Sequence, residues 1–388
     1  MAILVHEAHW GTVTVLHATP LLLTAASLFL LLGCGNDPIG FEFDESAPIT
    51  CAHGEGLTAP SEGRLYHGVF PGGRSGEEDD ITPVDVQQYE DAVGRRVAWV
   101  YFSNNWYRDR AFPLETATWI RDQGAVPFVR LMLRSRPEQN VSEPVFTLAA
   151  ILAGDFDEDL EAWGREAASF GTPVIVEWGT EVNGSWFSWN GVWNGGASIG
   201  PARFRAAYRH IVRTICSQSA SNVTWVFHVN SDDVPAVSWN ALDNYYPGDD
   251  AVDWVGVSVY GALTPTVAEW PIFADGMDAV VSRLAATAPD KPILVLEFGV
   301  TTGNPRGDAA IWADAALSDL VGGRWPEISG FSWWNETWQN DDDPTHDTNM
   351  RVQDIPGAAD LFRIRLASPV VVDRPILSGG PGPSHLAR

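Results

Sequence analysis

Two glutamates stand four residues apart in VIVEWGTEVNGSWFSWNG, residues 174–191. The second, Glu181, closes an apolar run, and another apolar run, PILVLEFG (292–299), contains Glu297 near its end. Two carboxyl groups that face one substrate can cleave a glycosidic bond. One protonates the leaving oxygen, and the other attacks the sugar carbon or stabilises the charge that develops there. Glu181 and Glu297 are therefore our candidate catalytic residues.

Glu177, the first glutamate of the segment, has a different role. Four residues of extended strand rise by about 13 Å, which is too far for both carboxylates to touch one glycosidic bond. Glu177 must therefore find a partner inside the fold. Our candidate is Arg130, a charged residue within the apolar run VPFVRLML (126–133).

Polar and aromatic residues also gather after Glu181 and at the ends of other apolar runs. Tryptophan offers a flat apolar face to a sugar ring, and amide, imidazole and phenol groups can bind its hydroxyls. For His228 the alternative is a hydrogen bond to another protein side chain, and Tyr260 could pair with Glu297. The candidate substrate-binding residues are Asn183, Trp186, Trp189, His228, Asn230, Tyr260, Trp333 and Trp334.

Eight apolar runs alternate with amphipathic or alanine-rich segments that are long enough for crossovers between parallel strands. This count and the length of the region predict a single (β/α)8 barrel, a TIM barrel, with a doubly wound sheet as the alternative. In such a barrel the carboxyl ends of strands four and seven lie on opposite sides of the mouth. The predicted strands are residues 65–70, 97–103, 126–133, 173–181, 223–230, 253–261, 292–299 and 328–336.

The composition narrows the class of partner. A formal net charge of −26, with 24 Lys plus Arg, argues against nucleic acid and anionic membrane surfaces. The sequence shows no metal-ligand spacing, phosphate-binding glycine loop or Ser-His-Asp pattern, so we expect no metal and no cofactor. We expect a monomer.

The two ends of the chain lie outside the predicted catalytic domain, residues 63–368. Residues 1–34 form an apolar leader that ends in Leu-Leu-Gly-Cys and resembles a bacterial lipoprotein signal. That resemblance implies lipidation of Cys34, and the alternative is a cleaved signal with an unmodified cysteine. Residues 35–62 are predicted to be a flexible tether, and residues 369–388 a tail that either straps the barrel or frays.

Two further cysteines remain, Cys51 and Cys216. In an exported protein an even pair can oxidise, so a disulfide is one prediction. Two buried free thiols are the other.

The motifs around the two glutamates resemble those of glycoside hydrolase family 26. TEVNGSWFSW is similar to that family's H-E-M-N-G-x-W-x-x-W motif, and KPILVLEFG to its nucleophile strand. The resemblance covers about residues 63–366 and implies a retaining barrel enzyme with Glu181 as acid/base and Glu297 as nucleophile. It also carries the first motif tryptophan onto Trp186, the strand-six tyrosine onto Tyr260 and the strand-eight tryptophan onto Trp333.

Two positions depart from the family pattern. Thr180 stands where the family usually has histidine, and Glu177 where it usually has arginine. Threonine has a hydroxyl but cannot carry a charge, so substrate contacts at this position should differ.

The resemblance implies an exported, lipid-anchored, endo-acting β-glycan hydrolase with β-mannan as its substrate. The alternatives are a hydrolase of β-1,3-xylan or β-glucan, and a carbohydrate-binding barrel without turnover. The membrane would be reached only through the lipid.

Overall fold

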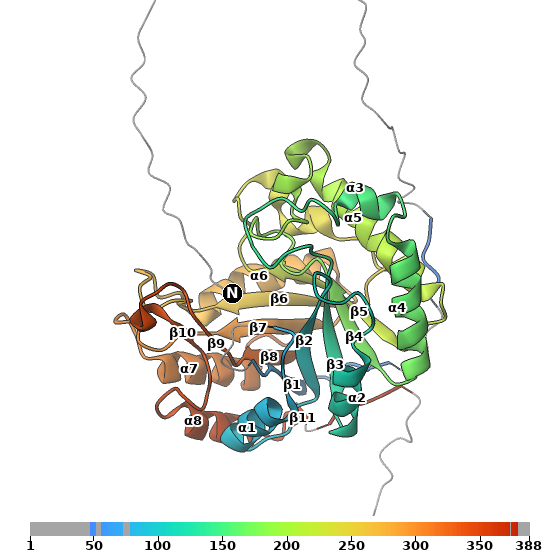
Figure 1. The fold of residues 1–388 in the computed structure, drawn as a ribbon. Helices are drawn as coiled ribbons and strands as arrows, with labels where there is room; N and C mark the ends of the chain where they lie inside the picture. Colours follow the sequence, from blue (N-terminus) through green and yellow to red (C-terminus); the bar gives the residue numbers. More distant parts are fainter. Residues whose placement is uncertain (1–46, 52–55, 73–77, 373, 379–388) are drawn as a thin grey trace, which may run out of the picture.

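The computed structural model describes residues 47–51, 56–72, 78–372 and 374–378. Its centre is a barrel in which strands β1 to β8 pair in chain order and β8 pairs back with β1. All these pairings are parallel. Figure 1 shows the strands converging at the centre of the molecule. The predicted TIM barrel is confirmed.

The strands lie close to the predicted runs. The main difference is in β4, which ends at Trp178, so Glu181 lies in the turn beyond the strand rather than in it. The bounds are β1 (Leu65–Phe70), β2 (Trp99–Asn105), β3 (Val126–Met132), β4 (Val174–Trp178), β5 (Val223–Asn230), β6 (Trp254–Tyr260), β7 (Ile293–Gly299) and β8 (Ile328–Trp334).

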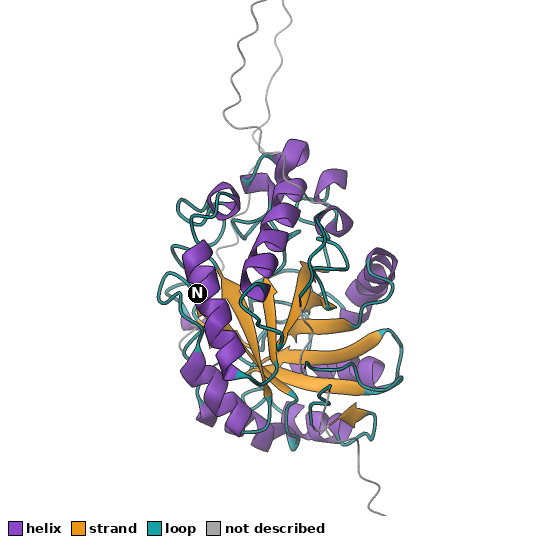
Figure 2. Ribbon diagram, turned by 90° about the vertical axis from the view of Figure 1, so that its right-hand side faces the viewer, coloured by secondary structure: helices purple, strands orange, loops and turns teal. Residues whose placement is uncertain are grey.

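Helices surround the barrel, as Figure 2 shows. None of those in the described ranges combines the length and apolarity that crossing a bilayer requires. The helices are α1 (Pro83–Val93), α2 (Leu114–Asp122), α3 (Leu148–Leu152), α4 (Asp157–Phe170), α5 (Gly196–Cys216), α6 (Phe273–Thr287), α7 (Ala309–Val321) and α8 (Ala358–Leu366).

A tryptophan fills the lower part of the barrel interior. Trp99 of β2 is fully buried, and its indole N–H donates to the hydroxyl of Ser332 on β8. Gly68 of β1 leaves room for the ring, since a Cβ at that position would lie 2.1 Å from Trp99 Nε1. The large Trp99 side chain thus occupies the space that glycine leaves at position 68, and side chains fill the centre of the barrel.

The segment predicted as a flexible tether is fastened where the structure describes it. The backbone N–H of Ile49 donates to Asp250 Oδ2 at 2.7 Å, and Arg209 of α5 donates to the carbonyl of Ala47 at 2.7 Å. Leu57 bridges to Leu377 in antiparallel fashion. Residues 47–51 and 56–62 therefore pack on the barrel domain.

The beginning of the C-terminal tail is a strap. Strand β11 (Val371–Val372) pairs with β1 through Leu65 and Tyr66. The hydroxyl of Tyr66 donates to the carbonyl of Thr58 at 2.8 Å and accepts from the N–H of Ile376 at 3.0 Å. Two segments far apart in the chain are thus joined below the barrel.

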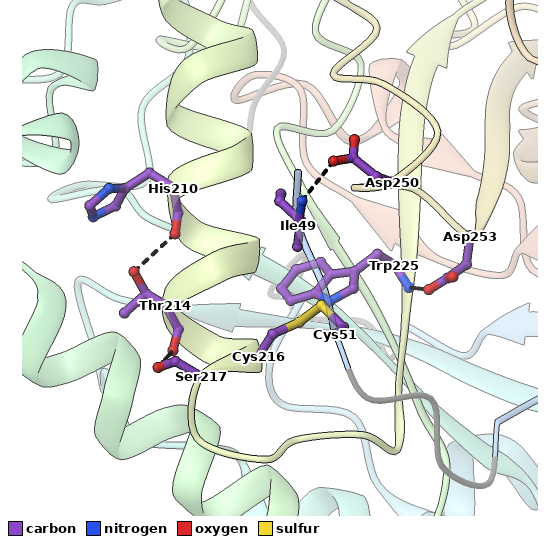
Figure 3. The surroundings of a disulfide bond; sticks show 9 residues. All are labelled: Ile49, Cys51, His210, Thr214, Cys216, Ser217, Trp225, Asp250 and Asp253. Atoms are coloured by element: carbon purple, nitrogen blue, oxygen red, sulfur yellow. Dashed lines mark hydrogen bonds between the residues drawn. A yellow bond between two sulfur atoms is a disulfide. The ribbon is translucent and has the colours of Figure 1, made fainter. Parts of the chain in front are cut away.

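The structure contains a disulfide between Cys51 and Cys216, the pair considered from sequence. Figure 3 shows it joining the N-terminal segment to the end of α5, beside Trp225. The bond closes a loop with a sequence separation of 165.

We expect reduction of this disulfide to lower the free energy of unfolding by about 2–4 kcal/mol, because a cross-link restricts the unfolded chain. The measurement is the melting temperature with and without reductant. The double variant Cys51→Ser, Cys216→Ser should melt like the reduced protein and ignore reductant. Two titratable thiols in unfolded, unreduced protein would contradict the bond.

Candidate active site

The turn after β4 has an unusual backbone. Gly179 has φ +77°, and a Cβ there would lie 2.4 Å from the ring of Phe204 on α5. Glu181 has φ +48°, in the left-handed region that residues other than glycine seldom occupy. Strained backbone of this kind persists where surrounding contacts impose it, and it is frequent at functional sites.

A side chain from the loop after β4 and one from the end of β5 hold the Glu181 carboxylate. The indole N–H of Trp186 donates to Glu181 Oε2 at 2.7 Å, and the amide of Asn230 donates to Oε1 at 2.8 Å. Each oxygen keeps a further lone pair, which leaves room for the proton that a general acid carries. The sequence had assigned Trp186 and Asn230 to substrate, whereas here they orient the carboxylate.

The Glu297 carboxylate, near the end of β7, is held by two phenols. The hydroxyl of Tyr260 donates to Oε2 at 2.9 Å, and that of Tyr101 lies 3.3 Å from Oε1. Arg130 Nη2 lies 3.7 Å from Oε1. Tyr260 therefore pairs with Glu297, as considered from sequence.

Glu177 lies below these two glutamates and is 1% exposed. Its Oε2 lies 2.7 Å from His228 Nδ1, and its Oε1 accepts from Tyr101 and lies 3.4 Å from Arg130 Nε. The expected Glu177 and Arg130 contact is present. Tyr101 connects Glu177 to Glu297, because its hydroxyl reaches both carboxylates.

The electrostatics distinguish Glu297 from Glu177. Burial raises the pKa of Glu297 to about 7; Arg130 opposes this rise and Glu181 adds to it. Burial also disfavours an ionised Glu177, but His228, Arg130 and Tyr101 hold the pKa of Glu177 below its usual value. Burial disfavours a charged His228, yet Glu177 raises the pKa of His228. Both shifts favour an ionised Glu177 beside a protonated His228.

Donor atoms of Glu177, His228 and Glu297 all lie within 4.8 Å of one another, a spacing that could also suit a metal ion. Arg130 already stands 3.4 Å from one of these carboxylates and 3.7 Å from the other. Its guanidinium therefore already gives both carboxylates a positively charged partner from the protein itself.

The sequence profile of Glycosyl hydrolase family 26 matches residues 150–287, a range that includes Glu181 and both donors to it. The resemblance to this family seen in the sequence is confirmed over these residues. The matched region runs from α3 through α6 and so includes the turn after β4.

Two curated relatives match the chain over different lengths. Endoglucanase H of Acetivibrio thermocellus is 24% identical over 282 residues, which are 72% of this chain and 28% of the relative. Beta-1,3-xylanase TXYA of Vibrio sp is 29% identical over 108 residues, 28% of this chain and 21% of that protein. The chain thus spans less than a third of each relative.

Among solved structures, the catalytic domain of the Bacillus sp. JAMB-750 GH26 endo-beta-1,4-mannanase aligns with a TM-score of 0.57 and 18% identity. The alignment covers 80% of this chain and 87% of that one. At this identity the likeness concerns the fold.

The two departures from the family 26 motif contact the same histidine. Thr180 is 1% exposed, and its hydroxyl lies 2.7 Å from His228 Nδ1. Because the Thr180 side chain points into the barrel, it does not contact substrate. A side chain at this position that pointed to the barrel mouth could do so. Glu177 is the ionic partner of that histidine.

Four residues predicted to contact substrate are buried elsewhere, and these assignments are corrected. Asn183 fastens the loop, donating to Asn230, Asp232 and Asp233. His228 is fully buried between Glu177 and Ser258. The remaining two are tryptophans that pack into hydrophobic surroundings.

Trp333 points away from the barrel mouth, against Phe362 of α8 and Trp312 of α7. Trp189 stacks on Phe187 and lines a cavity of about 260 Å³ that neither Glu181 nor Glu297 lines. Both indoles donate to backbone carbonyls. Neither ring is placed to stack on a sugar between the glutamates.

Trp334 is the strand-eight tryptophan on the side of the site. Its ring stacks on Phe70 with centroids 3.9 Å apart, and Arg130 lies over it at 5.3 Å. The assignment to Trp333 is therefore corrected to its neighbour. Successive residues of a strand face opposite ways, so a shift of one residue reverses the face.

Sequence reasoning missed Tyr101 and Ser258, which line the interior beside the glutamates. Ser258 Oγ lies 2.8 Å from His228 Nε2. In the sequence, Ser258 could have been noticed as a polar residue within the apolar run VGVSVY. The same indication had already singled out Arg130.

We expect kcat/KM to fall about tenfold per unit as the pH drops below about 7, because protonated Glu297 cannot attack. The measurement is a pH profile on a soluble substrate. Melting temperatures across the same range provide the control for unfolding. A profile that stays flat down to pH 5 would contradict the role of this group.

Proposed function

We propose that this chain is a retaining, endo-acting β-glycan hydrolase that cleaves β-mannan. The observation that carries the proposal is the pair Glu181 and Glu297, each held by its own donors and close enough for one charge to affect the other. The family model that matches residues 150–287, Glycosyl hydrolase family 26, supports a glycosidase.

The reaction would follow a double displacement. Glu181 gives its proton to the glycosidic oxygen while a Glu297 oxygen forms a bond to the anomeric carbon, and the leaving sugar departs with that proton. Glu181 then takes a proton from water, whose oxygen displaces Glu297. Tyr260 donates to Glu297 Oε2 and keeps the carboxylate oriented. Neither step draws on a cofactor.

Mannan is proposed first because the aligned Bacillus structure is of an endo-beta-1,4-mannanase. The names of the two curated relatives support testing glucan and β-1,3-xylan as well. The test measures reducing sugar and viscosity on β-mannan, β-1,3-xylan and mixed-linkage β-glucan. Rapid loss of viscosity on mannan, with the anomeric configuration retained, is the expected result.

Each other outcome of this panel has a definite meaning. Release from another polysaccharide alone would replace the substrate, and inverted products would replace the mechanism. Binding to a polysaccharide without release would leave a carbohydrate-binding barrel.

We also propose that the protein is exported and anchored through Cys34, which lies outside the described residues. In a bacterium with lipoprotein machinery, the wild type is expected in the membrane fraction and Cys34→Ser in the soluble fraction or unprocessed. As an internal control for the fractionation, a lipoprotein native to the same bacterium should appear in the membrane fraction. Equal partition of both forms would remove the anchor.

A further inference from the structure

Three carboxylates share one guanidinium inside the barrel. Arg130 lies 3.0 Å from Glu78, 3.4 Å from Glu177 and 3.7 Å from Glu297, and its own side chain is 3% exposed. Arg134 also acts on Glu78, so two guanidinium groups face three carboxylates, and an unbalanced buried charge is costly. When Glu297 is ionised, the cluster needs a further cation.

His228 is placed to be that cation. Its Nδ1 lies 2.7 Å from a Glu177 oxygen, and an ionised carboxylate can only accept, so Nδ1 carries a hydrogen. Its Nε2 faces the Ser258 hydroxyl at 2.8 Å, and a hydroxyl can accept from a charged ring. A carboxylate oxygen of Glu297 lies within 4.8 Å of a nitrogen of the His228 ring.

We propose that His228, held as an imidazolium by Glu177, is a positioning residue for Glu297. Its charge joins that of Arg130 in keeping the attacking carboxylate ionised inside the barrel. For its kinetic consequence the inference rests on the proposed function. It also gives Glu177 a role, since this carboxylate holds the imidazolium in place.

The charged groups around the ring agree with this assignment. Acidic groups face His228 from β4, from the turn beyond β4 and from β7, and all of them favour the protonated ring. They are Glu177, Glu181 and Glu297. Arg130 and Tyr101, from β3 and β2, contact Glu177 on its other oxygen. The charge of His228 in turn lowers the pKa of Glu297.

The kinetic test is the pH profile of kcat/KM for His228→Gln, which keeps hydrogen bonding but removes the charge. An opposite charge at this range typically changes a carboxyl pKa by 1–3 units, so we expect the acid limb to move up by about one unit. At pH 6 this is an approximately tenfold loss. Glu161→Ala, which removes a half-exposed carboxylate on α4, should leave the limb in place.

A second measurement needs neither substrate nor a folded variant at position 228. In wild-type protein with ¹⁵N-labelled histidine, NMR should show both ring nitrogens of His228 protonated above pH 7. In Glu177→Gln the ring should become neutral at lower pH than in the wild type.

The outcomes separate the two proposals. A wild-type His228 that is neutral at pH 6, or a His228→Gln limb at unchanged pH, would overturn the positioning role. Failure of the wild type to hydrolyse any polysaccharide would refute only the proposed function, because the NMR measurement is independent of turnover.

Discussion

Glu297→Ala is expected to abolish turnover of polysaccharide and of aryl β-glycosides alike, by on the order of 10⁴-fold or more. The variant lacks the nucleophile, so a good leaving group cannot compensate. Turnover of the polysaccharide and turnover of the aryl glycoside should therefore be lost together. Tyr260, Tyr101 and Arg130 remain around the vacated position.

Added azide provides the decisive measurement for this variant. It can enter the vacated position and attack the anomeric carbon directly, which gives a glycosyl azide of inverted configuration. Glu161→Ala, which removes a half-exposed carboxylate on α4, is the matched control and should keep wild-type activity. Substantial hydrolysis of polysaccharide by Glu297→Ala would remove Glu297 from the mechanism.

Glu181→Ala is expected to lose about 10²–10⁴-fold on polysaccharide, because the sugar leaving group needs protonation. Aryl glycosides with good leaving groups need little assistance, so the glycosyl-enzyme should still form on Glu297. Its hydrolysis should then be slow, because no base activates the water. A burst of released phenol followed by slow turnover is the expected signature.

Azide should restore turnover of Glu181→Ala and give a product of retained configuration. The donors of Trp186 and Asn230, which bind the carboxylate in the wild type, would then face the anion. Trp186→Phe keeps a ring but removes the donor and should cause a smaller loss. If Glu181→Ala lost both substrate types equally, or azide had no effect, the acid/base assignment would be wrong.

The barrel could be predicted from the sequence because its strands are nearly continuous apolar runs. Strands β1 and β5 begin and end at the predicted residues. Strand β4 is shorter than its run, since Gly179 turns the chain before Glu181. Residues 179–183 of the turn are as buried as the strand, and sequence pattern alone does not separate a strand from a buried loop.

The two glutamates could be predicted as a pair because parallel strands bring their carboxyl ends to one face. Their neighbours were harder to predict. Trp333 and Trp334 are adjacent and chemically alike. Which ring faces Arg130 depends only on which of the two residues lies on the inner face of β8. Asn183 and Trp189 follow Glu181 closely, but the loop turns both inward.

The sequence by itself determined the eight alternating units, the two candidate carboxylates and the need of Glu177 for an internal partner. These features depend only on the apolar pattern of neighbouring residues and on the rise per residue of a strand, and both are properties of short segments of chain. Only the tertiary structure decided which charges meet. His228, Arg130 and Tyr101 come from three other strands and surround Glu177 at distances set by barrel closure. Electrostatic energy depends on those distances and on burial, and neither can be read from positions along the chain.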